Sequence, residues 1–211
     1  MFEPQNWAWP INIVGLGAIG SQVFFDLYKL GFSEIHIWDK DLLEERNLKR
    51  QKVYRRVDVG KPKSEAAKLF ARRQGCESKI HVHKAYVQED TGLSGVVISG
   101  VDSMAGRQVI WEAVKRNFHR IPLFIDCRIG GDFVQVLSFT PADVQFWVNY
   151  ELRKLFGDDH KAELPCWESE LSAPAAFAAA VVVANLTRFA RNKPVKNNVS
   201  AHLGELTFTV N

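Results

Sequence analysis

Residues 12–21, NIVGLGAIGS, join a short apolar run to a glycine-rich turn. The glycines Gly15, Gly17 and Gly20 have the spacing Gly-x-Gly-x-x-Gly. In such a turn the first glycine permits a sharp bend, the second lets the backbone approach a phosphate, and the third lets a helix pack on the strand. The stretch therefore predicts a strand, a phosphate-binding turn that includes Ala18 and Ile19, and the N-terminus of a helix.

The residues after the turn complete a strand, helix, strand unit. Residues 21–30 have the apolar spacing of a helix, and residues 35–38 form a second apolar run. Asp39 ends that run 19 residues after Gly20, where a carboxylate can accept hydrogen bonds from a ribose. The turn does not distinguish a hydride-carrying dinucleotide from a triphosphate, and glycines that only allow close packing are the alternative.

The rest of the chain continues the alternation of strands and helices. We expect strands at 79–85, 95–99, 122–128 and 133–139, and helices within 58–73 and 106–117. The pattern predicts one α/β domain over 1–211, Rossmann-like and doubly wound, with a mostly parallel sheet and an antiparallel edge hairpin. Residues 141–172 are expected to form a long surface excursion with a short helix at 149–155, followed by a C-terminal apolar helix and a strand at 205–210.

Composition limits the compartment and the partners. The 211 residues are 46% hydrophobic and 24% charged, with a net charge of +3. Three cysteines without paired spacing argue against disulfides and against a structural zinc site. The N-terminus lacks a signal-like segment, and the apolar run 173–186 is too short to span a bilayer. We expect a cytoplasmic protein that binds neither a membrane nor nucleic acid.

A local cluster of basic residues follows Asp39. It lies close in sequence to the end of the second strand, where ligands bind in such sheets. A triphosphate needs more cations than the glycine turn supplies, so the cluster favours a triphosphate over a dinucleotide; a solvated helix face is the alternative. The cluster comprises Arg46, Lys49, Arg50, Lys61 and Lys63.

Four motifs in this order resemble the ThiF/MoeB/HesA superfamily, the ubiquitin-activating-enzyme-like adenylyltransferases. They are GLGAIGS (15–21), DKD followed by RNLKRQ (39–41 and 46–51), VGKPKSEAA (59–67) and SGVDSMAGR (99–107). The resemblance covers residues 11–140 well and the remainder loosely. The set is far more specific than a glycine turn alone.

The resemblance implies a role for individual residues. Asp39 would bind the ribose, Asn47 and Arg50 would grip the phosphates, and Asp102 would hold magnesium beside the triphosphate. Lys63 would touch the ribose and phosphates, Gln51 would support the phosphate pair, and Arg107 would be a structural partner. The implied nucleotide site is Gly15, Gly17, Ala18, Ile19, Gly20, Asp39, Asp41, Asn47, Arg50, Gln51 and Lys63, with Arg50, Lys63 and Asp102 as catalytic residues.

These residue types suit acyl adenylation. A carboxylate attacks the α-phosphate and pyrophosphate leaves, so fixed cations and a magnesium ion offset the repulsion between two anions. No general base is needed, because the carboxylate is already ionised. The alternative for Arg50 and Lys63 is that they are solvated surface residues that serve only solubility. The alternative for Asp102 is that it caps the N-terminus of a helix, a role that Ser103 can fill equally well.

The resemblance also implies an activity. We expect ATP- and Mg²⁺-dependent adenylation of the C-terminal carboxylate of a small ubiquitin-like or sulfur-carrier protein. Transfer of the acyl group to a cysteine, as a thioester, can follow this step. A second hypothesis is a nucleotide-bound scaffold with reduced activity, and a third is an NAD-dependent oxidoreductase. Activation of a small-molecule or tRNA carboxylate stays open.

Several features depart from the family pattern. No Lys or Arg precedes Lys29, so an arginine from an N-terminal extension is missing, and neither family Cys-x-x-Cys pair is intact. Cys166, in LPCWESE, is a candidate thiol nucleophile or else a packing residue, whereas Cys127 belongs to the expected core and Cys76 is incidental. Arg128 replaces a usually small residue and would meet an acidic group of the partner or an internal acid.

The final helix is apolar on nearly all sides. Its alanines allow close approach of another helix, as at a twofold interface. We therefore expect a homodimer, with burial inside the monomer as the alternative.

Overall fold

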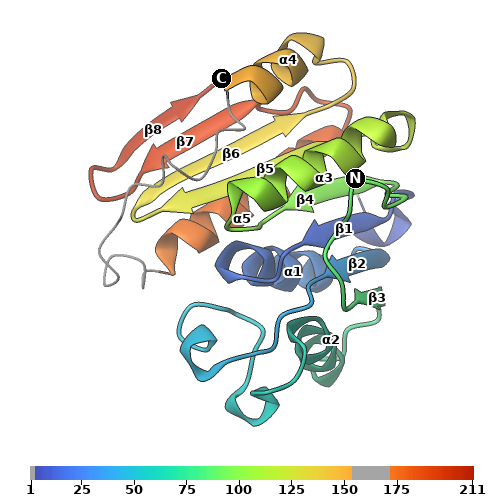
Figure 1. Cartoon of the computed structure of the whole chain (residues 1–211), viewed down its shortest axis with the longest axis vertical. Coiled ribbons are helices and arrows are strands. Elements are labelled where there is room, and N and C mark those ends of the chain that lie inside the picture. The colour runs from blue at the N-terminus through green and yellow to red at the C-terminus, as the bar shows by residue number, and fades with distance from the viewer. Residues whose placement is uncertain (1–2, 154–171) are drawn as a thin grey trace.

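The computed structural model describes residues 3–153 and 172–211, which form an eight-stranded sheet covered by helices (Figure 1). Its strands are β1 (Ile11–Val14), β2 (Glu34–Trp38), β3 (Lys79–His83), β4 (Val96–Ser99), β5 (Phe124–Gly130), β6 (Phe133–Phe139), β7 (Asn198–His202) and β8 (Thr207–Val210). Its α-helices are α1 (Ala18–Leu30), α2 (Lys63–Arg73), α3 (Met104–Arg116), α4 (Val144–Arg153) and α5 (Ala173–Ala190). Short 3₁₀ turns are η1 (Pro4–Asn6), η2 (Glu45–Asn47), η3 (Arg56–Asp58) and η4 (Phe118–Arg120).

One half of the sheet is parallel. The strand order is β3-β2-β1-β4-β5-β6-β7-β8, and the first five strands pair in parallel. The chain moves outward from β1 to β3 and then returns to the other side of β1 at β4, so the order reverses between β1 and β4. Ligands bind at the carboxyl ends of the strands at such a switch point. The expected Rossmann-like, doubly wound fold is confirmed.

The other half of the sheet is antiparallel. The expected hairpin is present, because β6 covers residues 133–139 and pairs with β5. The antiparallel part is larger than predicted, since β7 and β8 extend it by two strands. Strand β7 was not predicted, because its residues, NVSAH, are mostly polar or small and form no apolar run. The predicted last strand, 205–210, is β8 from Thr207 to Val210.

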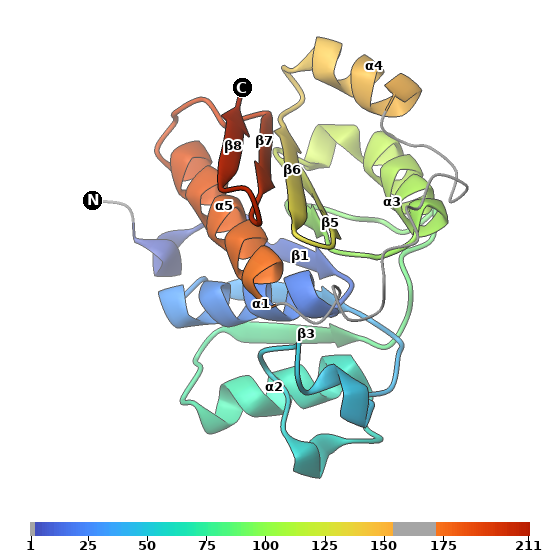
Figure 2. The same ribbon diagram turned by 90° about the vertical axis from the view of Figure 1, so that its left-hand side faces the viewer.

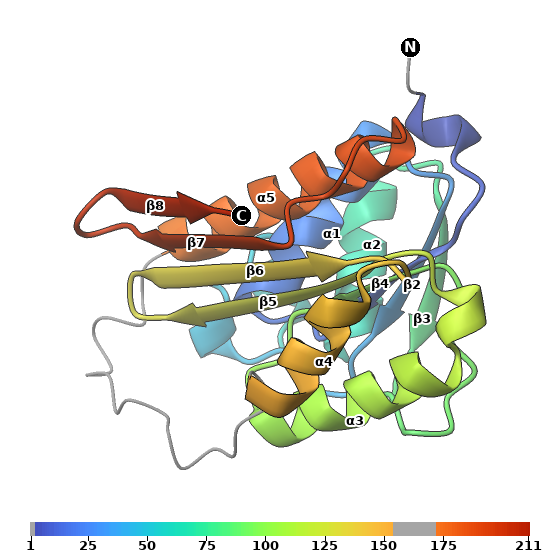
Figure 3. The same cartoon turned by 90° about the horizontal axis from the view of Figure 1, so that it is seen from above.

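Helices cover the two faces of the sheet. Helices α1, α2 and α5 lie on one face, and α3 and α4 lie on the other (Figures 2 and 3). Side chains alternate between two buried clusters along the strands, with Ile125 facing α1 and α5 and Phe124 facing α3 and α4. Trp111 of α3 lies in the second cluster against Phe124, Phe139 and Tyr150. This layering leaves the strand ends free to form a site.

Helix α5 is packed within the chain. Its closest neighbours are α1, β6 and β5, and Ala178, Ala179 and Val182 are among its buried residues. The buried alanines allow close packing of the helix within the chain, while Ala176, Ala180 and Ala184 are exposed. The helix has 18 residues, more than the apolar run of 14 indicated, and it is long and apolar enough to cross a membrane by length and composition. One such helix is weak evidence for a membrane span, because core helices of soluble proteins pass the same test.

The predicted surface excursion is helical where it is described. Helix α4 begins at Val144, earlier than the expected 149, and buries Tyr150 against α3. The helix begins earlier than expected because the chain already turns at Asp143, whose carbonyl accepts the Phe146 and Trp147 N–H groups. Residues 154–171, with Cys166, lie outside the described residues. Cys127 is fully buried, as expected for a core residue, and Cys76 is also buried.

Candidate functional site

A pocket of about 630 Å³ opens at the carboxyl ends of β1, β2 and β4. It lies at the switch point between β1 and β4. All the predicted nucleotide residues except Gly20 line it, and so does Asp102; these are Gly15, Gly17, Ala18, Ile19, Asp39, Asp41, Asn47, Arg50, Gln51, Lys63 and Asp102. Segments far apart in the sequence therefore meet at one cavity.

The three motif glycines have different surroundings. Gly15 has φ +87°, a conformation that favours glycine, and its N–H donates to Trp38 O at 2.9 Å. A Cβ on Gly20 would lie 1.8 Å from Gly15 O, so Gly20 serves the packing of α1 on the turn and does not line the pocket. A Cβ on Gly17 would meet no protein atom within 4 Å. The space beside Gly17 is therefore open to a ligand.

The N-terminus of α1 faces the pocket. Gly17 is its N-cap, and Gly17, Ala18 and Ile19 line the cavity. The first backbone N–H groups of a helix have no partners inside the helix, and they attract anions. No acidic side chain occupies the first turn. The turn therefore provides positive potential without a competing carboxylate.

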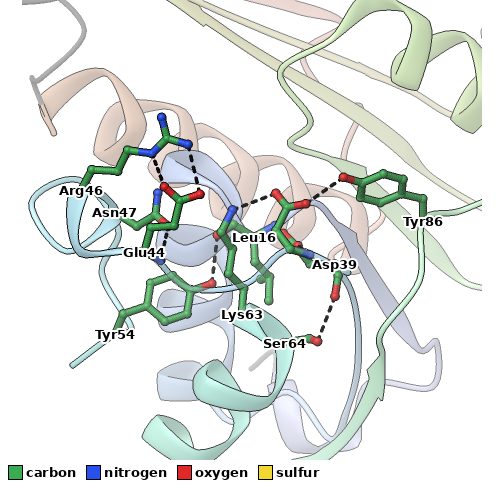
Figure 4. A network of polar contacts seen from close by, with 10 residues as sticks. Leu16, Asp39, Glu44, Arg46, Asn47, Tyr54, Lys63, Ser64 and Tyr86 are labelled. Carbon is green, nitrogen blue, oxygen red and sulfur yellow. Dashed lines mark hydrogen bonds and ion pairs between the residues drawn. The ribbon is translucent and has the colours of Figure 1, made fainter. Parts of the chain in front are cut away.

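Asp39 fixes the shape of the pocket floor. One carboxylate oxygen accepts the Leu16 N–H at 2.7 Å and the other accepts the Asp41 N–H at 2.8 Å (Figure 4). Burial raises the pKa of Asp39, although these two N–H donors oppose the rise. Ser64 Oγ donates to the Asp39 carbonyl at 3.0 Å. Asp39 thus ties the glycine turn to the start of α2, and its remaining lone pairs face the cavity that it lines.

Lys63 and Tyr86 lie on the pocket wall (Figure 4), and both contact Asp41. Lys63 Nζ lies 3.0 Å from Asp41 Oδ2, and the Tyr86 hydroxyl donates to Asp41 Oδ1 at 2.7 Å. The Lys63 side chain is only 10% exposed, so it is not a solvated surface lysine. Burial alone raises the pKa of Asp41, but the hydrogen bonds from Tyr86 and Lys63 outweigh it and leave that pKa lowered. The hydrogen bond to Asp41 raises the pKa of Tyr86 to about 12.

The segment of η2 supplies the next part of the wall. Asn47 Oδ1 accepts the Glu44 N–H at 2.9 Å, and the Arg46 guanidinium pairs with the Glu44 carboxylate at 3.1 Å (Figure 4). Arg50 and Gln51 follow directly and line the cavity. Gln51 Oε1 is buried and has no hydrogen-bond partner within the described residues. A buried acceptor without a partner beside a cavity indicates a ligand that donates to it.

Asp102 lies at the start of α3. The N-cap of α3 is Ser103, whose hydroxyl accepts the Gly106 N–H at 3.1 Å, so the alternative role of Asp102 as the cap is wrong. Asp102 is exposed, and it makes no ion pair within residues 3–153 and 172–211. Its charge contributes to the raised pKa of Tyr86 after the larger effects of Asp41. A carboxylate held at the pocket edge in this way is available to a cation.

A second charged group borders the pocket, which Arg107 also lines. Arg107 Nη1 donates to the Asp126 carboxylate and to Cys127 O, and its Nη2 donates to Val101 O. Arg107 is 5% exposed and Asp126 is fully buried. Arg107 is the structural partner that the family resemblance implied. Arg128 Nε lies 2.7 Å from the same Asp126 carboxylate, so of the two partners proposed for Arg128 the structure contains the internal acid.

Sequence reasoning missed part of the pocket. Trp38, Tyr86 and Gln88 line it, although no motif names them. Tyr86 and Gln88 belong to the segment between β3 and β4, whose residues show no glycine spacing or charge pattern. The one available signal was an aromatic residue closely following a predicted strand. Cys166 lies outside the described residues, so its place relative to the pocket stays a prediction.

The parallel sheet, the glycine turn at its switch point and the helices on both faces define a Rossmann-like doubly wound α/β fold. Residues 9–200 match the ThiF family. The match covers most of the chain, and the chain belongs to that family.

Relatives by sequence include two ubiquitin-like activating enzymes. The chain is 32% identical over 126 residues to the NEDD8-activating enzyme E1 catalytic subunit of Dictyostelium discoideum, covering 52% of this chain and 28% of that protein. It is 32% identical over 118 residues to the SAMP-activating enzyme E1 of Haloferax volcanii, covering 54% of this chain and 43% of that protein. The chain thus spans less than half the length of these relatives.

Solved structures share the fold. MccB of E. coli with ATP has a TM-score of 0.77 at 19% identity, covering 99% of this chain and 64% of MccB. PaaA has a TM-score of 0.76 at 18% identity, covering 99% of this chain and 73% of PaaA. At these identities the likeness describes the fold alone.

Proposed function

We propose that the chain binds ATP with Mg²⁺ in this pocket and adenylates a carboxylate at the C-terminus of a ubiquitin-like or sulfur-carrier protein. One observation carries the proposal. Arg50, Lys63 and Asp102, from three separate motifs, line a single cavity with the N-terminus of α1. That arrangement provides cations for phosphates and a carboxylate for a metal ion.

The residues present fit a nucleoside triphosphate. The glycine turn and the N–H groups of Ala18 and Ile19 suit phosphate oxygens, since the space beside Gly17 is open. Asp39 and the unpartnered Gln51 Oε1 are acceptors for donors on the sugar or base. Arg50 and Lys63 would contact the phosphates.

Asp102 would hold magnesium. The ion would neutralise charge on the β- and γ-phosphates and on the leaving pyrophosphate. An exposed carboxylate with no ion pair among the described residues can accept this role without losing an existing contact. A carboxylate with open coordination positions also suits Mg²⁺, which keeps several waters.

The reaction follows from these contacts. A substrate carboxylate oxygen attacks the α-phosphorus of ATP, the bond to the bridging oxygen of pyrophosphate breaks, and an acyl adenylate forms. Lys63 moves from its ion pair with Asp41 toward the phosphates, a short movement because its Nζ already lies at the pocket wall. Asp41 keeps the Tyr86 hydrogen bond, so its charge stays partnered.

The identity of the substrate rests on the relatives. The sequence relatives named above activate NEDD8 and SAMP by their names, and MccB was crystallised with MccA in other structures. These names favour a protein or peptide C-terminus over a small molecule or tRNA. We extend the proposal to a homodimer and to possible thioester formation at Cys166, each of which needs its own test.

A nucleotide-bound scaffold is the second candidate function. It is favoured by the lack of the paired Cys-x-x-Cys motifs within the 211 residues. The cations that line the pocket oppose it. The two functions differ in turnover and share nucleotide binding.

Pyrophosphate exchange tests the proposal. The protein is incubated with ATP, Mg²⁺, labelled pyrophosphate and candidate ubiquitin-like proteins that end in a free carboxylate. We expect exchange that needs both Mg²⁺ and the carboxylate, and that falls about 10²–10³-fold in Asp102→Asn. Asp90→Asn, on an exposed turn outside the pocket, is the matched control and should exchange normally.

Two outcomes contradict the enzyme. ATP binding without exchange for every carrier protein would favour the scaffold. A larger thermal stabilisation by NAD than by ATP with Mg²⁺ would favour an oxidoreductase, because at equal concentration the ligand that binds the native state more tightly stabilises it more. Intact-protein mass spectrometry of the same mixtures reports any adduct at Cys166.

A further inference from the structure

A cluster of imidazole and carboxylate side chains lies on β2 and β3, outside the nucleotide pocket. The parallel register pairs His36 with His81 directly, and Glu34 lies two residues before His36. Residues two apart on a strand share a face, so Glu34 and His36 project together. The opposite face carries Ile35 and Ile37, which belong to the core packed by α1. The register of two strands therefore brings three ligand-type side chains together.

The distances within the cluster suit one metal ion. Glu34 Oε1 lies 3.3 Å from His36 Nε2 and 3.0 Å from His81 Nε2. All three ligand atoms lie within 4.8 Å of one another. Ligands bound tetrahedrally to zinc at its usual bond lengths are separated by about 3.3 Å. Small side-chain shifts thus suffice to place the three atoms around one ion.

His81 supplies an independent observation. Its Nε2 is buried and has no hydrogen-bond partner within the described residues. The short distance to Glu34 Oε1 lacks hydrogen-bond geometry, so it is an ion pair only if the imidazole is protonated. A buried ring nitrogen without a hydrogen-bond partner, beside a carboxylate oxygen, is open to an ion that both atoms can bind.

His83 completes an outer layer around the cluster. His36 Nδ1 lies 3.1 Å from His83 Nε2, so His36 can donate its Nδ1–H there and keep Nε2 for a metal. Histidine ligands usually donate their second ring N–H to such a partner, which fixes the tautomer. The His83 ring in turn stacks on Trp38 with centroids 3.7 Å apart. Trp38 lines the nucleotide pocket, so the cluster reaches the pocket through two stacked rings.

We propose that Glu34, His36 and His81 bind a divalent transition-metal ion of the zinc type, with water in the open positions. Two imidazoles and one carboxylate are a common ligand set for such ions, whereas Mg²⁺ and Ca²⁺ prefer oxygen ligands alone. The site uses no cysteine, so it differs from the paired-cysteine zinc site that the sequence lacks. It does not depend on the proposed adenylation.

Binding requires two local changes. The His36 and His81 rings stack with centroids 4.3 Å apart and an interplanar angle of 18°, so they must tilt to aim both Nε2 atoms at one ion. Lys79 Nζ, 3.7 Å from Glu34 Oε1, must withdraw because it competes for the same carboxylate. Lys79 is 69% exposed, and water can solvate its charge once it moves.

Calorimetric titration with ZnCl₂ tests the site on the full, untagged chain after chelator treatment. We expect one ion per chain with an affinity of about micromolar or tighter. His36→Ala and His81→Ala should each weaken binding by about tenfold or more, and His83→Gln by about 10–100-fold as an outer partner. His119→Ala, an exposed histidine outside the cluster, is the matched control and should bind as the wild type does.

A second measurement covers variants that fold poorly. Glu34→Gln keeps the shape of the side chain and removes its charge, so folding should be unchanged and zinc affinity reduced. Co²⁺ absorption then reports the ligand types, with no thiolate band expected. No saturable binding by the wild type, unchanged affinity in both histidine variants, or a thiolate band lost in Cys166→Ser would each overturn the proposal.

Discussion

Two groups of residues meet at the nucleotide pocket, and they differ in what surrounds them. Protein atoms surround the residues of the packed layer, although Arg107 also borders the cavity, whereas the residues of the open wall face the cavity. The packed layer is Gly20, Arg107 and Asp126. The open wall is Gly17, Lys63, Asp41 and Asp102.

The same motif supplies both layers. In SGVDSMAGR, Asp102 is exposed at the pocket edge, while Arg107 is buried against Asp126. In GLGAIGS, a side chain at Gly20 would collide with the backbone, while one at Gly17 would meet no protein atom. Spacing therefore identifies the motif, and burial decides whether a residue serves the fold or the ligand. Substitutions should separate the two layers by stability and by activity.

The largest effect is expected in the packed layer. Asp126 is fully buried between Arg107 and Arg128, and the Tyr150 hydroxyl donates to it at 3.2 Å. Asp126→Ala would leave buried guanidinium groups without their carboxylate and lower the free energy of unfolding by about 3–5 kcal/mol. Urea denaturation measures the loss. Asp90→Ala is the control, and a loss below about 1 kcal/mol for Asp126→Ala would end the distinction between the layers.

Lys63 tests the open wall. Lys63→Ala should reduce pyrophosphate exchange by about 10²–10³-fold, because a preorganised cation near the phosphates is removed. Stability should change far less than in the Asp126 variant, since Asp41 keeps the Tyr86 hydrogen bond. Lys68→Ala on the same helix, outside the pocket lining, is the control. Equal exchange by both variants would remove Lys63 from the proposed site.

Within the glycine turn, Gly20 belongs to the packed layer and Gly17 belongs to the open wall. Gly20→Ala places a Cβ 1.8 Å from Gly15 O, so the backbone must move and unfolding should become easier by about 1–3 kcal/mol. Gly17→Ala should leave stability within about 0.5 kcal/mol, because its Cβ meets no protein atom. ATP affinity should nevertheless fall in Gly17→Ala, by about tenfold in a calorimetric titration. A stable Gly20→Ala, or a Gly17→Ala that binds ATP normally, would contradict this division.

The sequence predicted the parallel half of the fold well because its signals are local. The glycine turn, the apolar runs and the spacing to Asp39 all lie within one strand, helix, strand unit. The antiparallel half was predicted only in part. Strand β7 forms because β6 offers a free edge, and pairing across more than fifty residues leaves little trace in a short polar segment.

The candidate site shows the same limit. Motif spacing named Lys63 and Asp102, which line the pocket, but it could not show that Tyr86 hydrogen-bonds Asp41. Nor could it choose between a partner and an internal acid for Arg128, because that choice depends on which side chains share the inside of the fold. Long-range contacts decide these cases, and a single sequence does not record them.

The smallest expected effect concerns acid stability at the open wall. Hydrogen bonds from Tyr86 and Lys63 outweigh burial and lower the pKa of Asp41 from its ordinary value of 3.8. A lowered folded-state pKa contributes stability above the unfolded-state value and loses it as the pH falls through the folded-state value. Asp41→Asn should therefore be less stable than the wild type at pH 6, by at most about 1 kcal/mol because Asp41 is exposed.

That difference should shrink as the pH falls below the ordinary value of 3.8, because the wild-type carboxylate then becomes protonated. Urea denaturation of both proteins at pH 6 and at a series of pH values below 3.8 measures it, with Asp102→Asn as the control because Asp102 has no ion pair among the described residues. A difference that stays constant with pH would mean that the Asp41 charge adds nothing to the fold. Asp41 would then matter only for holding Lys63 at the pocket, as its place on the open wall implies.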